Sequence, residues 1–236
     1  MMRISEIYAS LQGEGLLAGT PSTFVRATGC NLRCTWCDTP FTSWEPVGEE
    51  RTVAEIVAEV DRLGRKHVVV TGGEPLLFAE VVDVCRILRA RGVHVTIETA
   101  GTVLPAAAEQ LADLMSISPK LGSSKPPPGT PGGWASRHDA ARRRDDVLRA
   151  LLAAGPYQLK FVVDAPADLA EALAWLGDLG LATGAIDPAR VLLMPQGRNP
   201  AELARVAAWL ELECHRAGFQ FAARHHIAWF GHTRGT

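Results

Sequence analysis

Residues 66–75 read Lys66-His67-Val68-Val69-Val70-Thr71-Gly72-Gly73-Glu74-Pro75, an apolar run that ends in small and polar residues. An apolar run without alternation is typical of a strand in a parallel sheet, with helices on one face and a packed interior on the other. Pro75 suits the first turn of a helix. The stretch therefore predicts a strand–helix unit that carries polar residues at the carboxyl end of its strand.

The same unit recurs along the chain. Strands are predicted at 3–10, 21–27, 67–71, 93–98, 114–118, 158–163, 190–194 and 219–229. Helices are predicted at 52–63, from Pro75 to Gly92, and at 105–111, 139–153, 167–176 and 200–217. Repeated strand–helix units favour parallel pairing with right-handed crossovers. Six units between about residues 21 and 217 predict an α/β fold, a partial or modified (βα)6-type TIM barrel.

An open doubly wound sheet is the structural alternative. The barrel is favoured because polar clusters follow several of the predicted strands, and barrel enzymes keep their active sites at the carboxyl ends of the strands. An open sheet binds ligands mainly at one crevice. The clusters are Thr71–Glu74, Glu98–Gly101, Ser118–Lys120 and Pro195–Gly197.

The bulk composition narrows the class of protein. The chain has 236 residues, enough for one core and too few to require two domains. A formal net charge of −2 gives no basic face for nucleic acid. No apolar run reaches membrane-spanning length, and the N-terminus lacks the apolar region of a signal peptide. We therefore expect one domain over residues 1–236, in the cytoplasm.

Five cysteines are unevenly placed along the chain. Cys85 and Cys214 lie in apolar helical runs, where a free cysteine behaves as a small buried hydrophobic residue. The other three fall within Gly29-Cys30-Asn31-Leu32-Arg33-Cys34-Thr35-Trp36-Cys37-Asp38-Thr39. An odd count in a reducing compartment argues against a disulfide framework.

Three thiolates on one short loop can bind three of the four irons of a [4Fe–4S] cluster. The fourth iron then stays open to the amino and carboxylate groups of a small molecule. A structural zinc site is the alternative, but zinc normally takes four ligands, and no second pair of ligands lies nearby. His225 and His226 come very late in the chain.

The C-x3-C-x2-C spacing, followed by Thr71-Gly72-Gly73-Glu74-Pro75, resembles the radical S-adenosylmethionine superfamily. Within it, the chain is similar to the 7-carboxy-7-deazaguanine synthase family. Segments that carry this likeness are Glu6–Gly15, Phe24-Val25-Arg26, Cys37-Asp38-Thr39, Glu98-Thr99, Ser118-Pro119-Lys120, Gln158–Val162 and Met194–Gly197. Two departures are a long Pro/Gly loop at 121–133 and an altered ending after Trp229.

The resemblance implies a radical ring contraction. Reduced cluster cleaves S-adenosylmethionine to methionine and a 5′-deoxyadenosyl radical, which takes a hydrogen atom from 6-carboxy-5,6,7,8-tetrahydropterin. Ammonia leaves and 7-carboxy-7-deazaguanine forms, in queuosine or other deazapurine biosynthesis. The implied cofactors are a [4Fe–4S] cluster, S-adenosylmethionine and Mg²⁺. The implied partners are the pterin, an electron donor such as flavodoxin or ferredoxin, and a second copy of the chain in a homodimer.

The resemblance also implies roles for particular residues. It implies that Cys30, Cys34 and Cys37 bind the cluster and that Thr39 binds Mg²⁺. The residues implied to bind S-adenosylmethionine are Trp36, Cys37, Asp38, Gly73, Ser118, Pro119, Lys120, Met194, Pro195, Gln196 and Gly197. The residues implied to bind the substrate are Leu11, Gln12, Gly13 and Glu14 in an N-terminal segment, Arg26, Thr71, and His226 in a C-terminal closing strand.

Each role has a plainer alternative. Gln12 to Gly15 is also a glycine-rich turn, Arg26 a surface ion pair and Thr39 a turn residue before Pro40. The strand-end groups could be ordinary loop caps, and His226 could face solvent in a terminal strand. Lys160 within an apolar strand needs a partner. Two rival functions are a glycyl-radical-enzyme activase and a non-catalytic iron–sulfur sensor.

Overall fold

The computed structural model describes residues 1–236, and one nine-stranded sheet runs through it. The strand order is β3-β1-β2-β4-β5-β6-β7-β8-β9. The strands are β1 (Met2–Leu11), β2 (Pro21–Ala27), β3 (Glu49–Arg51), β4 (His67–Gly72), β5 (His94–Thr99), β6 (Leu114–Ile117), β7 (Tyr157–Val163), β8 (Val191–Pro195) and β9 (Gln220–Phe221). Strand β2 and strands β4 to β9 pair in parallel, whereas β1 and β3 add to one edge in antiparallel fashion.

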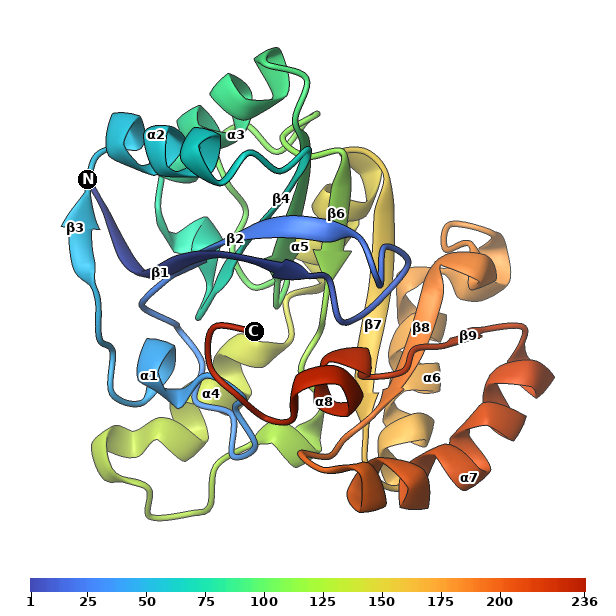
Figure 1. Cartoon of the computed structure of the whole chain (residues 1–236). Helices are drawn as coiled ribbons and strands as arrows, with labels where there is room; N and C mark the ends of the chain where they lie inside the picture. The colour runs from blue at the N-terminus through green and yellow to red at the C-terminus, as the bar shows by residue number, and fades with distance from the viewer.

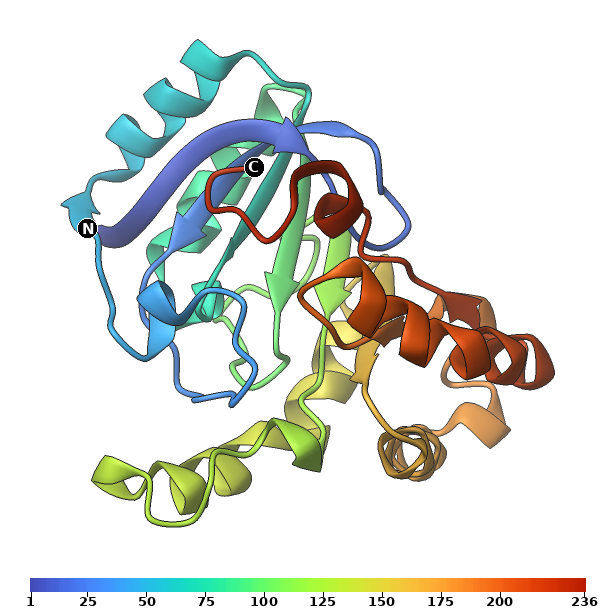
Figure 2. The same cartoon turned by 60° about the horizontal axis from the view of Figure 1, so that its bottom comes forward.

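The helices are α1 (Pro40–Ser43), α2 (Val53–Leu63), α3 (Glu80–Ala90), α4 (Trp134–Arg142), α5 (Asp145–Ala153), α6 (Pro166–Leu179), α7 (Pro200–Ala217) and α8 (His225–Phe230). Helices α2, α3, α5, α6 and α7 connect the parallel strands and cover one side of the curved sheet (Figure 1). Figure 2 shows the concave side, where α8 lies away from the outer helices. The predicted partial barrel is confirmed, and the doubly wound sheet, which needs helices on both faces, is excluded.

Side chains of the parallel strands alternate between two environments. One set, which includes Val25, Val70, Ile97, Ile117 and Phe161, joins a core of 38 buried residues under the helices. Their neighbours one position further along β2, β4 and β5, and one position earlier along β6 and β7, face the concave side and are polar: Arg26, Thr71, Glu98, Ser116 and Lys160. The fold thus separates a dry core from a polar concave surface.

The helix α2 shows how a local sequence pattern predicts a helix. Thr52 accepts a hydrogen bond from the backbone N–H of Glu55, whose carboxylate accepts from the backbone of Thr52, so the predicted capping box is confirmed. Gly64 ends the helix in the left-handed region, with φ of 67°. No helix of the structure is both long and apolar enough to cross a membrane.

Three predicted helices differ in the structure. The segment 105–111 forms turns, because seven residues are too short to hold a helix without packing and Gln110 takes a positive φ of 54°. The region 139–153 is two helices, α4 and α5, separated by extended backbone at Arg143. The helix expected from Pro75 begins with a 3₁₀ turn at Pro75–Leu77, and α3 follows.

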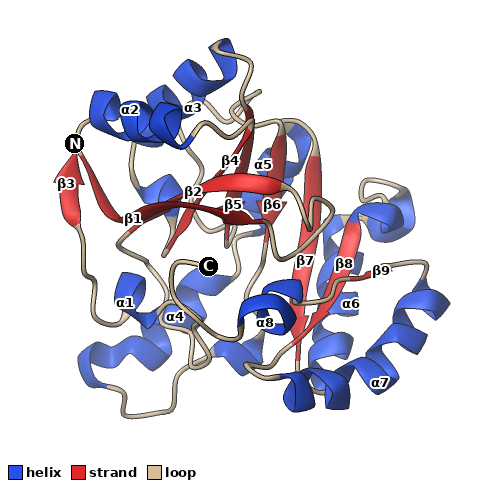
Figure 3. Cartoon of the chain, in the orientation of Figure 1, coloured by secondary structure: helices blue, strands red, loops and turns tan.

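The predicted strand at 219–229 is wrong. Only Gln220 and Phe221 pair with β8, and residues 225–230 form the helix α8 (Figure 3). The chain leaves the sheet because the backbone N–H of His225 donates to the carbonyl of Gly13, which draws the segment across the concave side. The closing element of the fold is therefore a helix, and His226 lies on it.

Candidate active site

A cavity of about 480 Å³ lies on the concave side of the sheet, and most of the predicted site residues line it. From the N-terminal segment come Leu11, Gln12, Gly13 and Glu14, and from the cysteine loop come Cys30, Cys34, Trp36, Cys37, Asp38 and Thr39. Strand ends and α8 supply Arg26, Thr71, Gly73, Ser118, Lys120, Met194 and His226. Four predicted residues are absent from the wall: Pro119, Pro195, Gln196 and Gly197.

Gln12 is held in one orientation at the floor of the cavity. Its side-chain amide donates to Glu98 Oε1 at 3.1 Å, and its carbonyl accepts from the backbone N–H of Gly13 at 2.8 Å. The other oxygen of Glu98 accepts from the Thr71 hydroxyl at 2.8 Å. Glu98 was recognised as part of a motif, but its role as the partner of Gln12 and Thr71 was not predicted.

Gly13 permits helix α8 to approach the N-terminal segment. A Cβ atom at this position would lie 2.5 Å from His226 Cβ, closer than side-chain atoms approach in proteins. The His225 N–H donates to the Gly13 carbonyl at 2.9 Å. The glycine-rich turn at Gly13 thus also lines the cavity. His226 faces the cavity rather than open solvent.

Glu14 sits among cations. Its carboxylate accepts from Lys160, and at 3.1 Å from Arg224 Nε, while His226 Nδ1 lies 3.7 Å away. Burial alone would raise the pKa of Glu14, but Lys160, Arg224 and His226 outweigh burial and hold the pKa well below its usual range. Glu14 is therefore an ionised carboxylate, and Lys160 has the partner that its position in an apolar strand required.

Arg224 was missed by the sequence analysis. Its side chain is only 3% exposed and joins three parts of the site. It donates to Glu14, to Asp38 Oδ2 at 2.6 Å and to the carbonyl of Gly197 at 2.6 Å. Gly197 thus supports the site from outside its wall. Nothing in the sequence around Arg224 distinguishes it from a surface arginine.

Arg26 lies in the cavity wall and already has protein partners. Its guanidinium donates to Glu6 Oε1 and to the Tyr8 hydroxyl, each at 2.7 Å. The plain alternative of an ion pair is therefore present in the structure, although the pair is mostly buried. The remaining donors of the guanidinium fork leave room for contact with a carboxylate.

The three cysteine thiols of the loop are free and converge on the same cavity. Burial raises the pKa of Cys30 and of Cys34 to about 12, so thiolates there need a positively charged partner. No three His, Cys, Asp or Glu side chains are close enough to surround one metal ion. A cube-shaped cluster takes its cysteines at separate corners, so these thiols fit a cluster better than a single zinc ion.

Gly73 brings the end of β4 against the cysteine loop. A Cβ atom there would lie 2.3 Å from the carbonyl oxygen of Gly29 and 2.8 Å from Cys30 Cβ. The backbone N–H of Glu74 donates to the same carbonyl at 2.9 Å. The Glu74 side chain is fully buried and accepts from Thr99, so it holds β5 in place and does not face the cavity.

Two polar atoms beside the cysteines lack a hydrogen-bond partner, namely Trp36 Nε1 and Asp38 Oδ1. Buried polar groups rarely remain unpaired, so both atoms are available to a ligand, and His232 Nε2 lies 3.6 Å from Asp38 Oδ1. Lys120 donates to Ser118 Oγ at 2.9 Å, and Met194 packs with Trp36 in a small apolar cluster. This part of the cavity therefore combines an apolar surface with free polar groups, as a nucleoside and an amino acid require.

Thr39 Oγ1 lies 4.0 Å from Cys37 Sγ and 3.1 Å from the hydroxyl of Thr42. Thr39 precedes α1, but its side chain makes no cap to that helix. Thr39 therefore lines the cavity at the end of the cysteine loop, and its hydroxyl also bonds within the turn that starts α1.

The fold and the thiol-lined cavity define a class of protein. The family model described as the Radical SAM superfamily matches residues 24–165, which span β2 to the end of β7 with the cysteine loop between. The chain therefore belongs to the radical S-adenosylmethionine superfamily, as the cysteine spacing predicted.

Within that superfamily, the chain belongs to the 7-carboxy-7-deazaguanine synthase family. It is 44% identical over 234 residues to the 7-carboxy-7-deazaguanine synthase of Rhodopirellula baltica, covering 99% of this chain and 88% of the relative. It is 45% identical over 231 residues to that of Halobacterium salinarum, covering 95% and 89%. The crystal structure of QueE from Escherichia coli shares the fold, with a TM-score of 0.68 at 24% identity over 95% of this chain and 94% of that one.

Proposed function

We propose that this chain is a lyase that converts 6-carboxy-5,6,7,8-tetrahydropterin to 7-carboxy-7-deazaguanine by a radical ring contraction with loss of ammonia. The observation that carries the proposal is the meeting of the cysteine loop and the Gln12-Gly13-Glu14 segment in one cavity. Membership of the 7-carboxy-7-deazaguanine synthase family supports the same reaction.

When bound, the [4Fe–4S] cluster and S-adenosylmethionine supply the 5′-deoxyadenosyl radical that takes a hydrogen atom from the substrate. The protein's own part is to hold and to shield. Cys30, Cys34 and Cys37 would hold the cluster. Trp36, Asp38, Gly73, Ser118, Lys120 and Met194 would hold S-adenosylmethionine at the side of the cavity that carries the unpaired polar atoms.

The N-terminal segment and the polar strand ends suit a pterin. An ionised Glu14 can accept hydrogen bonds from the N–H groups at the edge of the ring, and Lys160 and Arg224 keep it ionised. Gln12 and Thr71 are fixed by Glu98 and present a polar floor. Arg26 would pair with the substrate carboxylate, and His226 would contact the ring from α8.

Magnesium would bind at Thr39. The residue offers one hydroxyl, and Mg²⁺ commonly keeps waters and substrate oxygens as its other ligands. Held by Thr39 near Cys37, the ion would orient substrate oxygens and neutralise their charge.

The remaining partners follow from the family. We expect an electron donor of the flavodoxin or ferredoxin class, a homodimer and a cytoplasmic location, with queuosine or other deazapurine biosynthesis as the destination of the product. A glycyl-radical-enzyme activase, the nearest rival, would need a protein substrate and has no use for the Gln12-Gly13-Glu14 segment.

An anaerobic assay tests the proposal. The reconstituted protein is incubated with S-adenosylmethionine, reductant and the carboxy-tetrahydropterin, and both 5′-deoxyadenosine and 7-carboxy-7-deazaguanine are measured by mass spectrometry. We expect both products, with deoxyadenosine depending on the pterin. Deoxyadenosine without any deazaguanine would reject the synthase, and the absence of both would support the iron–sulfur sensor instead.

A further inference from the structure

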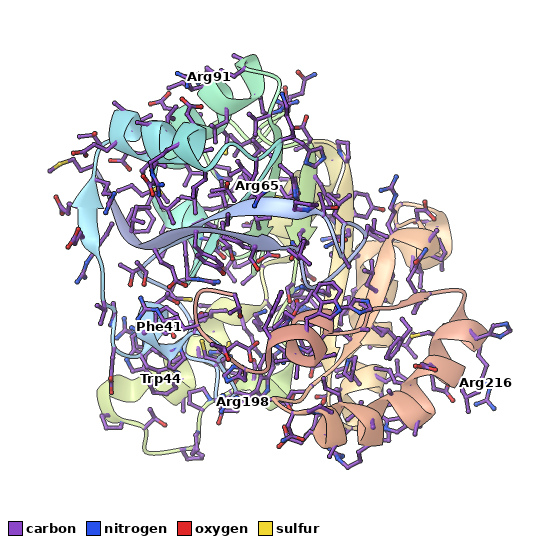
Figure 4. The ribbon with its side chains drawn as sticks, viewed as in Figure 1. Phe41, Trp44, Arg65, Arg91, Arg198 and Arg216 are labelled. Atoms are coloured by element: carbon purple, nitrogen blue, oxygen red, sulfur yellow. The ribbon has the colours of Figure 1, made fainter.

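The cysteine loop, residues 30–39, lacks regular secondary structure, and side chains from elsewhere bind its backbone. Trp44 Nε1 donates to the carbonyl of Cys34 at 2.9 Å, and Arg198 donates to that of Cys37 at 3.1 Å. Both residues are labelled in Figure 4; Trp44 directly follows α1, and Arg198 lies just before α7. Arg33 itself bonds the carbonyls of Cys30 and Leu32. Hydrogen bonds from side chains therefore help to set the shape of the loop.

The segment 121–142, which contains the long Pro/Gly loop and α4, is attached to the barrel at both ends. Glu171 on α6 accepts from the backbone N–H of Gly122 at 2.7 Å and from Arg142 at 2.6 Å. Figures 1 and 2 both show α4 alongside the cysteine loop and away from the sheet. The Glu171 carboxylate thus binds both the start and the end of the segment 121–142.

His138, at the middle of α4, connects the segment to the cysteine loop. Its ring is fully buried, and Nδ1 accepts from the backbone N–H of Arg33 at 3.1 Å. Its Nε2 lies 2.9 Å from Ser124 Oγ, and that hydroxyl donates to the carbonyl of Leu121 at 2.6 Å. Because the hydroxyl proton is already used, Nε2 must carry the ring proton and Nδ1 must be the acceptor.

Two further contacts join the same surfaces. The carbonyl of Ser124 accepts from the backbone N–H of Thr35 at 2.9 Å. The Arg33 guanidinium lies 4.0 Å from the centre of the Trp134 ring, as does that of Arg137. The residues on both sides of Cys34 are therefore held by the segment 121–142.

We propose that His138, oriented by Ser124, is a positioning residue for the iron–sulfur cluster. By fixing the backbone N–H of Arg33, it sets the direction in which Cys34 presents its thiol to the iron. Burial lowers the pKa of His138 to about 4, so the ring is neutral at pH 7 and Nδ1 is free to accept. The inference rests on the cluster of the proposed function and is independent of the substrate.

Three substitutions of His138 separate the effect of its hydrogen bond to the backbone of Arg33 from the effect of the volume of its ring. His138→Asn places a carbonyl oxygen near the position of Nδ1 and can still accept from Arg33. His138→Gln reaches toward Ser124 instead, and His138→Leu fills the space without any polar atom. A matched control is His67→Asn, since His67 is also buried and hydrogen-bonded, to Ser22 and Thr96, but lies near the opposite ends of the strands.

The measurements are iron and sulfide per chain after anaerobic reconstitution, the rate of iron loss to a chelator, and the electron paramagnetic resonance spectrum of the reduced cluster with and without S-adenosylmethionine. We expect His138→Leu and His138→Gln to lose iron roughly 10–100-fold faster than wild type, as is usual when a residue behind a metal ligand is removed. His138→Asn should stay close to wild type, and so should His67→Asn.

Iron loss from His138→Leu at the wild-type rate would overturn the inference, and so would equal loss from the Asn and Gln variants. Equal loss from His67→Asn would show a general effect of stability and would overturn it as well. If the Leu variant fails to fold, the Asn and Gln pair decides. A wild-type protein that takes up no iron would instead reject the cluster of the proposed function.

Discussion

At the scale of single residues, Thr39 gives a direct test of the proposed magnesium site. Thr39→Ala removes one hydroxyl and little volume, so the cluster and S-adenosylmethionine binding should survive while the stimulation of product formation by Mg²⁺ is lost. Thr39→Ser keeps the hydroxyl and should retain the stimulation. Product formation is measured across a magnesium titration after adventitious metal has been removed. An equal magnesium dependence in wild type and Thr39→Ala would return Thr39 to the role of a turn residue.

Lys160 tests the charge of Glu14. Lys160→Met removes a buried cation that lowers the pKa of that carboxyl, so the pKa should rise and Glu14 should become protonated as the pH falls. The KM for the pterin should then increase toward acidic pH in the variant. In the wild type, Glu14 stays ionised between about pH 6 and pH 8, a range near neutrality. Its charge should therefore cause no change in the KM for the pterin over this range.

We expect kcat/KM of Lys160→Met to fall about 10–100-fold at pH 7, which corresponds to roughly 1.4–2.8 kcal/mol. Lys66→Met changes an exposed lysine and serves as the control. Binding of S-adenosylmethionine should be equal in both variants. A flat KM profile for Lys160→Met would show that the pterin does not depend on the charge of Glu14.

At the scale of elements, the N-terminal ends of the strands carry a pH-dependent contact. His67 on β4 lies between Ser22 on β2 and Thr96 on β5, and burial, with a smaller contribution from His94, lowers its pKa to about 4, although Glu98 and Asp113 act in the opposite direction. Because the unfolded chain binds the proton more readily, the contact stabilises fully above about pH 6.5, the unfolded pKa, and its contribution is lost as pH falls toward 4.

His67→Asn cannot take up this proton, so its free energy of unfolding should depend less on pH. We expect the wild type to lose about 1–2 kcal/mol more than the variant between pH 7 and pH 5. Urea unfolding followed by circular dichroism at several pH values measures this difference. The exposed His215 provides the control, since His215→Asn should follow the wild-type curve. Parallel curves for His67→Asn and wild type would contradict the assignment.

Elements were predictable where a local pattern decided them. The apolar run Val68–Val70 and the capping box at Thr52 and Glu55 depend on neighbours in sequence, and both are confirmed. The helix α8 was not predictable, because its direction depends on the hydrogen bond between His225 and Gly13, more than two hundred positions away in the chain. For the same reason Arg224 was not predicted, because its partners Glu14 and Asp38 lie 210 and 186 positions away in the chain.

At the scale of the whole molecule, the apolar core and the cavity lie on opposite faces of the sheet. The core of 38 residues includes Cys85 and Cys214, whereas the cluster cysteines belong to a small separate group with Leu32 and Ala100. The chain should therefore fold without its cluster. We expect the triple variant Cys30→Ala, Cys34→Ala, Cys37→Ala to bind no iron and to form no product, yet to unfold cooperatively at a denaturant midpoint close to that of the apoprotein.

For the two buried cysteines, Cys85 and Cys214, we expect the opposite result, with the cluster and turnover kept. Cys85→Ala and Cys214→Ala should keep wild-type iron content and turnover, at a cost in stability of about 1 kcal/mol each from the small cavities that they leave. Iron analysis and urea unfolding measure both quantities. Loss of iron from either single variant would mean that the three cysteines of the loop are not the ligands.

The cavity wall is assembled from regions that are far apart in sequence. The cysteine loop ends at residue 39, its partner His138 lies in the segment 121–142, and Arg224, which binds Glu14 and Asp38, comes near the last helix. A ribosome delivers these regions in that order, at about 5–20 residues per second. The thiols thus leave the ribosome well before the groups that fix and enclose them. We therefore expect iron and sulfide to be held firmly only after His138 and Arg224 have been synthesised.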